Sequence, residues 1–137
     1  MRPATLVLCT GNSARSQMGE GFFRQYLGDR FEIHSAGTRP GSLRPEAVAV
    51  MAEVGIDISR HRSKPVDEFL SREFSFIITV CDNARENCPY LPGNARRIHW
   101  GFEDPAAVEG DEQTRLAAFR EIRDQIRGRV EEFAKSV

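Results

Sequence analysis

The sequence predicts a single α/β domain, a three-layer sandwich built on a four-stranded parallel sheet. Two mainly apolar runs, residues 5–9 and 74–81, lack strict polar alternation, which is typical of strands buried on both faces in parallel sheets. Strand-like runs also alternate with segments whose apolar residues recur every three or four positions, the pattern of βαβ units. A length of 137 residues accommodates this one domain, residues 1–137, and no second.

The N-terminal half of the chain supplies two strand–helix pairs. Residues 5–9 form the first predicted strand, and a helix follows over residues 16–27, because its apolar residues fall on one face and a glycine succeeds it. Residues 31–35 are predicted as a short strand. Residues 45–54 are predicted as a helix, with a proline in its first turn and a glycine just after its end.

The C-terminal half supplies two more strands and a long helix. Residues 74–81 and 97–100 are the predicted strands, and between them the polar residues 82–94 contain two prolines and a glycine, which favours a mobile loop. Apolar residues step by three or four over residues 112–134 and predict one amphipathic helix. Because ligands of such sheets bind beyond the carboxyl ends of the strands, Cys9 and Cys81 could share one site.

Composition and charge exclude several classes of function. Hydrophobic residues make up 40% of the chain and charged residues 28%, a balance that argues against a disordered or membrane protein. The net charge of −1 provides no overall basic field, so we expect no nucleic-acid or membrane partner, and the first apolar run is too short for a signal peptide. Three cysteines form no even disulfide framework, which favours a cytoplasmic, reducing location. We expect a monomer.

Residues 9–16, Cys-Thr-Gly-Asn-Ser-Ala-Arg-Ser, place a cysteine, five residues and an arginine between a buried strand and a helix. In this position backbone N–H groups can curl around a tetrahedral anion, and the helix N-terminus adds favourable partial charge. Arg15 can bind two oxygens of that anion, and the same field would lower the pKa of Cys9 to give a thiolate. Ser16 can cap the helix and donate a hydrogen bond to the sulfur. The predicted anion-binding residues are Thr10, Gly11, Asn12, Ser13, Ala14 and Arg15.

This loop resembles the phosphate-binding loop shared by low-molecular-weight protein tyrosine phosphatases and thioredoxin-coupled arsenate reductases. The similarity extends along nearly the whole chain, through residues 35–37, 55–59 and 99–105. Gln17 and Ala106 stand where these phosphatases usually carry a proline and an aromatic residue, which favours the reductases. The resemblance implies a low-molecular-weight phosphatase-like fold, arsenate as substrate, thioredoxin as reductant and no cofactor.

Cys81 and Cys88 give a chemical reason to favour the reductases. Hydrolysis of a phosphate ester needs one cysteine, whereas reduction of arsenate needs two electrons, which two thiols supply when they form a disulfide. Cys9 would attack arsenic, and Cys81 would attack the Cys9 sulfur and expel arsenite. Cys88 would then move the disulfide to Cys81–Cys88, within reach of thioredoxin, and this exchange requires residues 82–91 to rearrange. The spacing of Cys81 and Cys88 matches that of the reductases.

Asp104 precedes a proline and is the predicted general acid, which would protonate the oxygen that leaves arsenic as water. Without the resemblance, an Asp-Pro pair is equally an ordinary turn. His61 lies between two arginines and could tune the thiols as a neighbour of Cys81, or could lie in an exposed basic turn.

A metal site is not expected. Some reductases of this family bind potassium near the loop, through positions that match Asn12, Glu20 and Ser35 together with a threonine and an aspartate. Arg62 and Lys64 stand at those last two positions here. Because a cationic side chain repels a metal ion and can take its place, we expect no potassium requirement.

Three hypotheses follow. The leading one is a cytoplasmic arsenate reductase recycled by thioredoxin, with the catalytic residues Cys9, Cys81, Cys88, Arg15, Asp104 and Ser16. The second is a low-molecular-weight protein tyrosine phosphatase, and the third is a non-catalytic oxyanion or redox sensor. The second and third cysteines favour reduction over hydrolysis, and the intact loop with its acid favours catalysis over sensing. Any of the cysteines could instead be a plain buried side chain.

Overall fold

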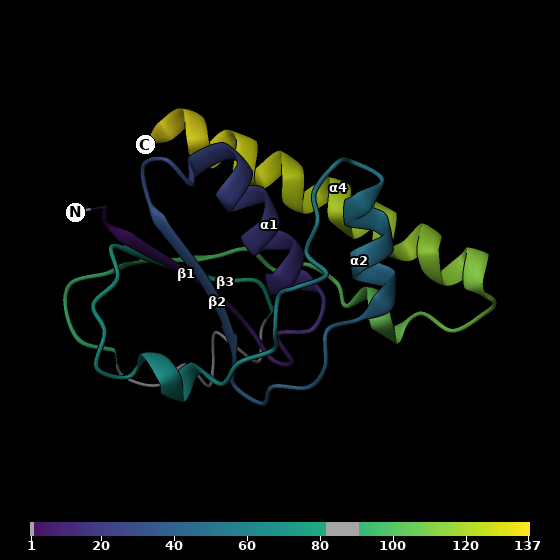
Figure 1. Ribbon diagram of the computed structural model, residues 1–137, viewed down its shortest axis with the longest axis horizontal. Coiled ribbons are helices and arrows are strands. Elements are labelled where there is room, and N and C mark those ends of the chain that lie inside the picture. The colour runs from purple at the N-terminus through teal and green to yellow at the C-terminus, as the bar shows by residue number, and fades with distance from the viewer. Residues whose placement is uncertain (1, 82–90) are drawn as a thin grey trace.

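The computed structural model describes residues 2–81 and 91–137. Within them the chain forms the predicted α/β domain with a four-stranded parallel sheet, in the order β2-β1-β3-β4 (Figure 1). The strands are β1 Ala4–Cys9, β2 Glu32–Gly37, β3 Phe76–Thr79 and β4 Arg96–His99. Every residue of the central strand β1 is buried, as its continuous apolar run predicted.

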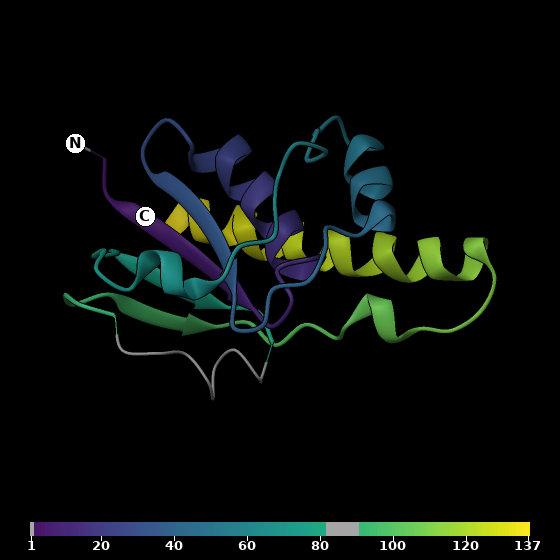
Figure 2. The ribbon, with the colours of Figure 1, turned by 60° about the horizontal axis from the view of Figure 1, so that its bottom comes forward.

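The α-helices of the described residues gather on one side of the sheet (Figure 2). They are α1 Arg15–Leu27, α2 Pro45–Ala52 and α4 Glu112–Ser136, and α1 packs against both α2 and α4. Two 3-10 helices, η1 Val66–Phe69 and η2 Pro105–Ala107, lie in the connections. In the part of the chain that the structure describes, no helix combines the length and the apolar character needed to cross a bilayer.

The two faces of the sheet are covered by different elements. Phe76 of β3 packs edge-on against Phe133 of α4, with ring centroids 5.1 Å apart, so its face of the sheet meets the helices. His34 of β2 points to the opposite face, because successive side chains of a strand alternate, and there it meets Phe69 of η1 at 5.3 Å. Helices, sheet and the η1 region therefore form the three predicted layers.

Some boundaries differ from the predicted ones. Strand β3 is four residues long instead of the eight predicted. The prediction followed the apolar run, and buried residues extend beyond the four that form the β-ladder. Strand β2 extends to Gly37, two residues farther than predicted. Of the loop predicted over residues 82–94, residues 82–90 lie outside the described part of the chain, and Cys88 lies with them.

Candidate active site

The two cysteines predicted at strand ends lie beside each other. Cys9 is the last residue of β1, and Cys81 follows shortly after β3, the strand that pairs with β1. Both side chains are buried. The Thr10 hydroxyl lies 3.2 Å from the Cys81 sulfur, and a hydrogen bond joins the thiols of Cys81 and Cys9. The order of the strands thus brings the two thiols to one place at the carboxyl edge of the sheet.

The surroundings of Cys9 raise the pKa of its thiol well above the usual range. The hydrogen bond with Cys81 and the burial of the side chain raise the pKa, and they outweigh the lowering by Arg15 and by the backbone N–H of Asn12. The prediction of a Cys9 thiolate is therefore wrong for this arrangement. The sequence does not reveal that a second thiol lies against the first in a buried space, where a neutral pair is favoured over a charged sulfur.

The loop after β1 turns at Asn12, whose φ is 48°. Asparagine adopts this left-handed conformation more readily than most residues. Its carbonyl oxygen accepts hydrogen bonds from Gln17 Nε2 at 3.0 Å and from Ser63 Oγ at 2.6 Å, so the carbonyl is held on the side of the protein interior. Its N–H is hydrogen-bonded to the Cys9 sulfur. The backbone of Asn12 is thus held at its carbonyl from the interior and donates its N–H toward the nucleophile.

Ser16 is not the helix cap that the sequence predicts. Helix α1 begins at Arg15, and its N-terminal capping residue is Ala14, which makes no side-chain hydrogen bond. Ser16 lies inside the first turn and is fully buried, and its Oγ accepts a hydrogen bond from Asn12 Nδ2 at 2.8 Å. The cap was misplaced because the helix starts one residue earlier than its apolar pattern indicates. The hydroxyl instead fixes the loop.

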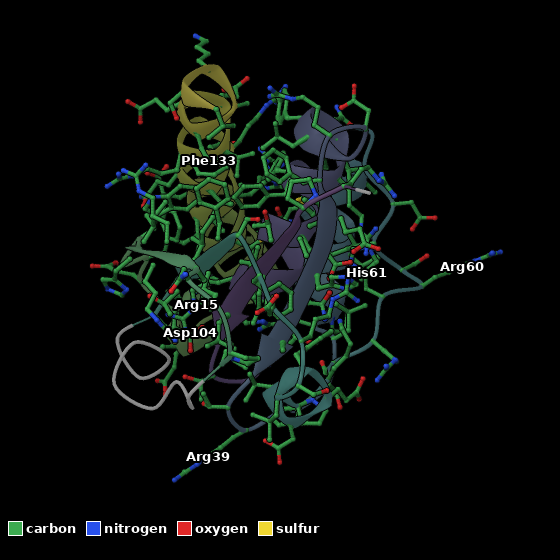
Figure 3. The ribbon with its side chains drawn as sticks, turned by 90° about the vertical axis from the view of Figure 1, so that its left-hand side faces the viewer. Arg15, Arg39, Arg60, His61, Asp104 and Phe133 are labelled. Atoms are coloured by element: carbon green, nitrogen blue, oxygen red, sulfur yellow. The ribbon has the colours of Figure 1, made fainter. Side chains whose placement is uncertain are left out.

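Arg15 and Asp104 lie at the same end of the sheet (Figure 3). The guanidinium group of Arg15 donates to the backbone oxygen of Phe102 at 2.9 Å, and its second nitrogen lies 3.8 Å from the Asp104 carboxylate. The other carboxylate oxygen of Asp104 accepts from the Ala106 N–H at 3.0 Å and caps η2. Asp104 is thus a turn residue and, at the same time, a half-exposed acid beside the predicted anion-binding arginine.

A buried carboxylate behind the loop forms a charged cluster. Burial raises the pKa of Glu20, but the hydrogen bond from Ser35 and the nearby His61, Lys64 and Arg24 outweigh burial, and the pKa lies below its usual value. Lys64 Nζ lies 3.7 Å from one carboxylate oxygen of Glu20, and Arg24 Nε lies 2.9 Å from the other. Glu20 is therefore charged in the native protein.

Lys64 supplies a cation at the position where the sequence resemblance implies a potassium ligand in some reductases. Its side chain is only 12% exposed, and burial lowers its pKa while Glu20 raises it. Its backbone N–H also donates to Asn12 Oδ1 at 2.9 Å, which ties this cluster to the loop. Among the described residues, no group of three or more His, Cys, Asp and Glu side chains could hold a metal ion.

His61 is not an exposed turn residue, because its side chain is only 17% exposed and faces Gln17 and Glu20. Its Nδ1 lies 3.0 Å from Gln17 Oε1, and its Nε2 lies 3.6 Å from Glu20. Because Gln17 Nε2 donates to two backbone carbonyls, Gln17 Oε1 must accept, and the proton of neutral His61 lies on Nδ1. Sequence reasoning assigned Gln17 no structural part. The position of the polar Gln17 on the buried face of an amphipathic helix could have indicated such a part.

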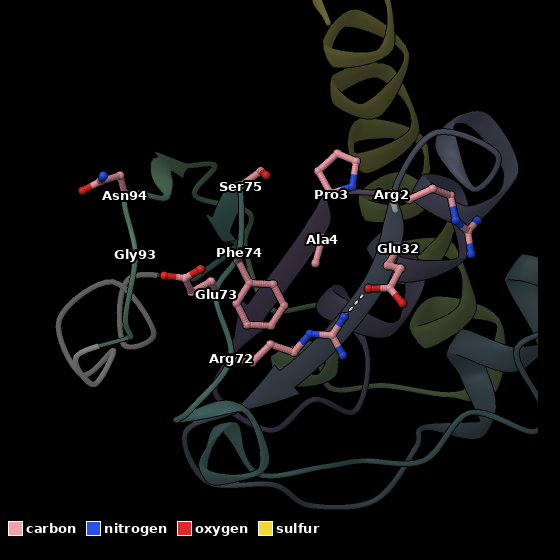
Figure 4. A pocket seen from close by; sticks show the side chains of 10 residues that line it. All are labelled: Arg2, Pro3, Ala4, Glu32, Arg72, Glu73, Phe74, Ser75, Gly93 and Asn94. Carbon is pink, nitrogen blue, oxygen red and sulfur yellow. Dashed lines mark hydrogen bonds and ion pairs between the residues drawn. The ribbon is translucent and has the colours of Figure 1, made fainter.

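A cavity of about 550 Å³ lies at the amino-terminal ends of β1 and β2, opposite to the end that carries the cysteines (Figure 4). Its lining includes the first residues of β1 and β2, Ala4 and Glu32, and an ion pair between Glu32 and Arg72. The cysteines lie at the carboxyl ends of the strands, so this cavity is not part of the candidate site. Cys88, the third predicted thiol, lies outside the described residues.

Comparisons with known proteins show the family of this chain. The family model described as low molecular weight phosphotyrosine protein phosphatase matches residues 4–137. An arsenate reductase from Bacillus subtilis (strain 168) is 46% identical over 129 residues, which cover 94% of this chain and 93% of the relative. One from Halalkalibacterium halodurans is 45% identical over the same share of both chains.

Solved structures show the same fold. A structure described as an arsenate reductase in the phosphate binding state superimposes with a TM-score of 0.80 at 30% identity, and covers 100% of this chain and 99% of the other. The tyrosine phosphatase Wzb from Escherichia coli K30, solved in complex with sulphate, gives a TM-score of 0.82 at 21% identity over 99% of both chains, a likeness of fold alone. This chain belongs to the low molecular weight phosphotyrosine protein phosphatase family.

Proposed function

We propose that this chain is an arsenate reductase in which Cys9, Cys81 and Cys88 act in turn and a reductant of the thioredoxin class restores them. The observation that carries this proposal is the contact between the Cys9 and Cys81 thiols beside the loop. Hydrolysis has no use for the second thiol, whereas reduction requires it. The names of the relatives described above support the same substrate. The proposed reaction uses no cofactor, and we propose that the protein acts in the cytoplasm as a monomer.

In the first step, the Cys9 sulfur attacks arsenic held against the N–H groups of the loop and Arg15. A sulfur–arsenic bond forms, and an arsenic–oxygen bond breaks. An arsenate hydroxyl takes a proton from Asp104 and departs as water, and the thiol proton of Cys9 restores the proton of Asp104 through solvent, so the net products are the thiol–arsenate adduct and one water. The high pKa of Cys9 means that removal of this proton is part of the cost of the step.

In the second step, Cys81 attacks the sulfur of Cys9. A disulfide forms, the sulfur–arsenic bond breaks, and its electron pair stays on arsenic, which leaves as arsenite and takes up the proton that the Cys81 thiol loses. Thr10 Oγ1, at 3.2 Å from the Cys81 sulfur, is placed to hold this second nucleophile near the first. Cys88 then attacks Cys81 and releases Cys9, and a dithiol protein reduces the Cys81–Cys88 disulfide.

A second candidate function is phosphatase activity. The loop, Arg15 and Asp104 are the parts that ester hydrolysis needs, and arsenate and phosphate are both tetrahedral oxyanions. We propose it as a weak side activity that uses Cys9 alone. A sensor without turnover is the least favoured function, because it would leave the acid beside Arg15 without a role.

The deciding experiment follows arsenate-dependent NADPH oxidation with thioredoxin and thioredoxin reductase. Wild-type protein should turn over repeatedly, and Cys88→Ser should stop after about one cycle. Cys9→Ser should lose both reduction and any hydrolysis of p-nitrophenyl phosphate, because both reactions begin with the same sulfur. Equal steady-state rates for wild type and Cys88→Ser would refute the relay. Hydrolysis without any reduction by the wild type would make the chain a phosphatase.

A further inference from the structure

The segment that follows β2, residues 38–44, runs beside the loop of residues 9–13 and is bonded to it through the backbone. Four of its N–H groups donate to the carbonyl oxygens of loop residues 9, 10, 11 and 13. These bonds join Thr38 to Cys9 at 3.1 Å, and Arg39 to Thr10, Gly41 to Gly11 and Arg44 to Ser13 at 2.9 Å each. This pairing begins where the ladder of β1 and β2 ends, at Cys9 and Gly37, but the two segments drift out of the parallel register along it.

The two other carbonyls of the loop are also held from outside. Asn12 O accepts from Gln17 and Ser63, and Ala14 O accepts from the Met18 N–H inside α1. Every carbonyl from residue 9 to residue 14 is therefore bonded to a donor of the protein. Within one planar trans peptide the C=O and the N–H of the next residue point in opposite directions. Carbonyls fixed on the outer side therefore turn the N–H groups of the same peptides to the inner side, where an anion needs donors and is repelled by carbonyl oxygens.

The end of β2 leaves no room for a side chain beside the loop. A Cβ on Gly37 would lie 2.5 Å from Thr10 O and 3.0 Å from Asn12 N, so a substitution would have to move the loop backbone. The Gly37 N–H donates to Lys64 O at 2.8 Å, which holds this residue from its other side. Gly37 is thus confined between the loop and the segment that carries Lys64.

We propose that residues 37–44 are a positioning element of the anion site, which fixes the orientation of the loop peptides and hence the affinity for a tetrahedral oxyanion. The element acts through its hydrogen bonds to the loop backbone. The identity of the physiological anion rests on the proposed function, but the effect on binding rests on these hydrogen bonds alone. Inorganic phosphate, which thiols do not reduce, is therefore a suitable probe.

The first test removes one backbone donor. Gly41→Pro deletes the N–H that bonds Gly11 O, and Gly41→Ala keeps it, with a Cβ that meets nothing within 4 Å. We expect calorimetric titration of the reduced full chain to give phosphate binding about tenfold weaker in Gly41→Pro than in Gly41→Ala. Equal affinities in these two variants would overturn the proposal.

The second test displaces the loop directly. Gly37→Ala should weaken phosphate binding at least about tenfold and raise the pH at which iodoacetamide alkylates Cys9 half-maximally, because the Asn12 N–H moves away from the sulfur. The control is Gly128→Ala on α4, which adds the same methyl group at a position where a Cβ meets nothing within 4 Å. Circular dichroism checks that each variant is folded, and if Gly37→Ala does not fold, the Gly41 pair decides.

The outcomes separate this inference from the proposed function. If wild-type protein binds phosphate and the variants weaken that binding, but arsenate is not reduced, the positioning element stands and the reductase fails. If arsenate is reduced and both variants bind phosphate as tightly as their controls, the positioning element fails alone. A wild-type chain that binds no phosphate would overturn both.

Discussion

Replacement of Lys64 by methionine should destabilise the protein through Glu20. The two charges lie 3.7 Å apart, and both side chains are nearly buried, at 12% and 5% exposed. At an effective dielectric constant of about 20, their attraction is about 4 kcal/mol, and recovery of the lysine's hydration on unfolding offsets part of it. His61, Arg24 and Ser35 still contact Glu20 in the variant. We therefore expect a net loss of about 2 kcal/mol in the free energy of unfolding at pH 7.

The loss should depend on pH in a defined direction. The native pKa of Glu20 is depressed, so the carboxylate contributes stability above its unfolded pKa of about 4.3 and loses it as the pH falls through the native value. The difference between wild type and Lys64→Met should thus be full at pH 7 and shrink below about pH 4. Urea unfolding monitored by Trp100 fluorescence measures it across this range.

The chain offers a matched control for this measurement. Lys135, in the last turn of α4, is exposed, and Lys135→Met makes the same chemical change without a buried partner. Lys135→Met should lower the free energy of unfolding by no more than about 0.5 kcal/mol. A loss for Lys64→Met no larger than for Lys135→Met, or one that stays constant down to pH 3, would refute the ion-pair reasoning.

Three further predictions concern the same structure. Wild-type activity should be equal in potassium and sodium chloride, because Lys64 already supplies a cation to Glu20, and a potassium-specific increase in steady-state rate would contradict this. Burial lowers the pKa of His34, so the free energy of unfolding of the wild type should fall as the pH drops below about 6.5. The urea midpoint of His34→Leu should fall less with pH than that of the wild type, and an equally steep fall in both would contradict this role of His34. Arg15→Lys should lower kcat/KM for arsenate about a hundredfold, because a lysine cannot bind the anion with two parallel hydrogen bonds, and an unchanged value would remove Arg15 from the site.

Local patterns in the sequence predicted the elements well where burial and pairing coincide. The central strand and the long C-terminal helix lie within two residues of their predicted ends, because each has its own apolar period and the helix has a capping aspartate at Asp111. The loop of residues 9–16 was also found from sequence, since its spacing and its position between a strand and a helix are both local features. Strand β3 was overextended because burial continues beyond its ladder.

The sequence by itself determined the order of the elements, the parallel sheet and the place of Cys9 and Arg15 in a turn before a helix, because these depend on residues close together in the chain. Tertiary structure alone decided the direction in which the pKa of Cys9 shifts, which depends on the neighbouring Cys81 and on burial. It also decided that Lys64 reaches Glu20 and that residues 38–44 hold the loop carbonyls. Contacts such as that between Thr10 and Cys81, 71 residues apart, are fixed by how the layers pack, and no local pattern records them.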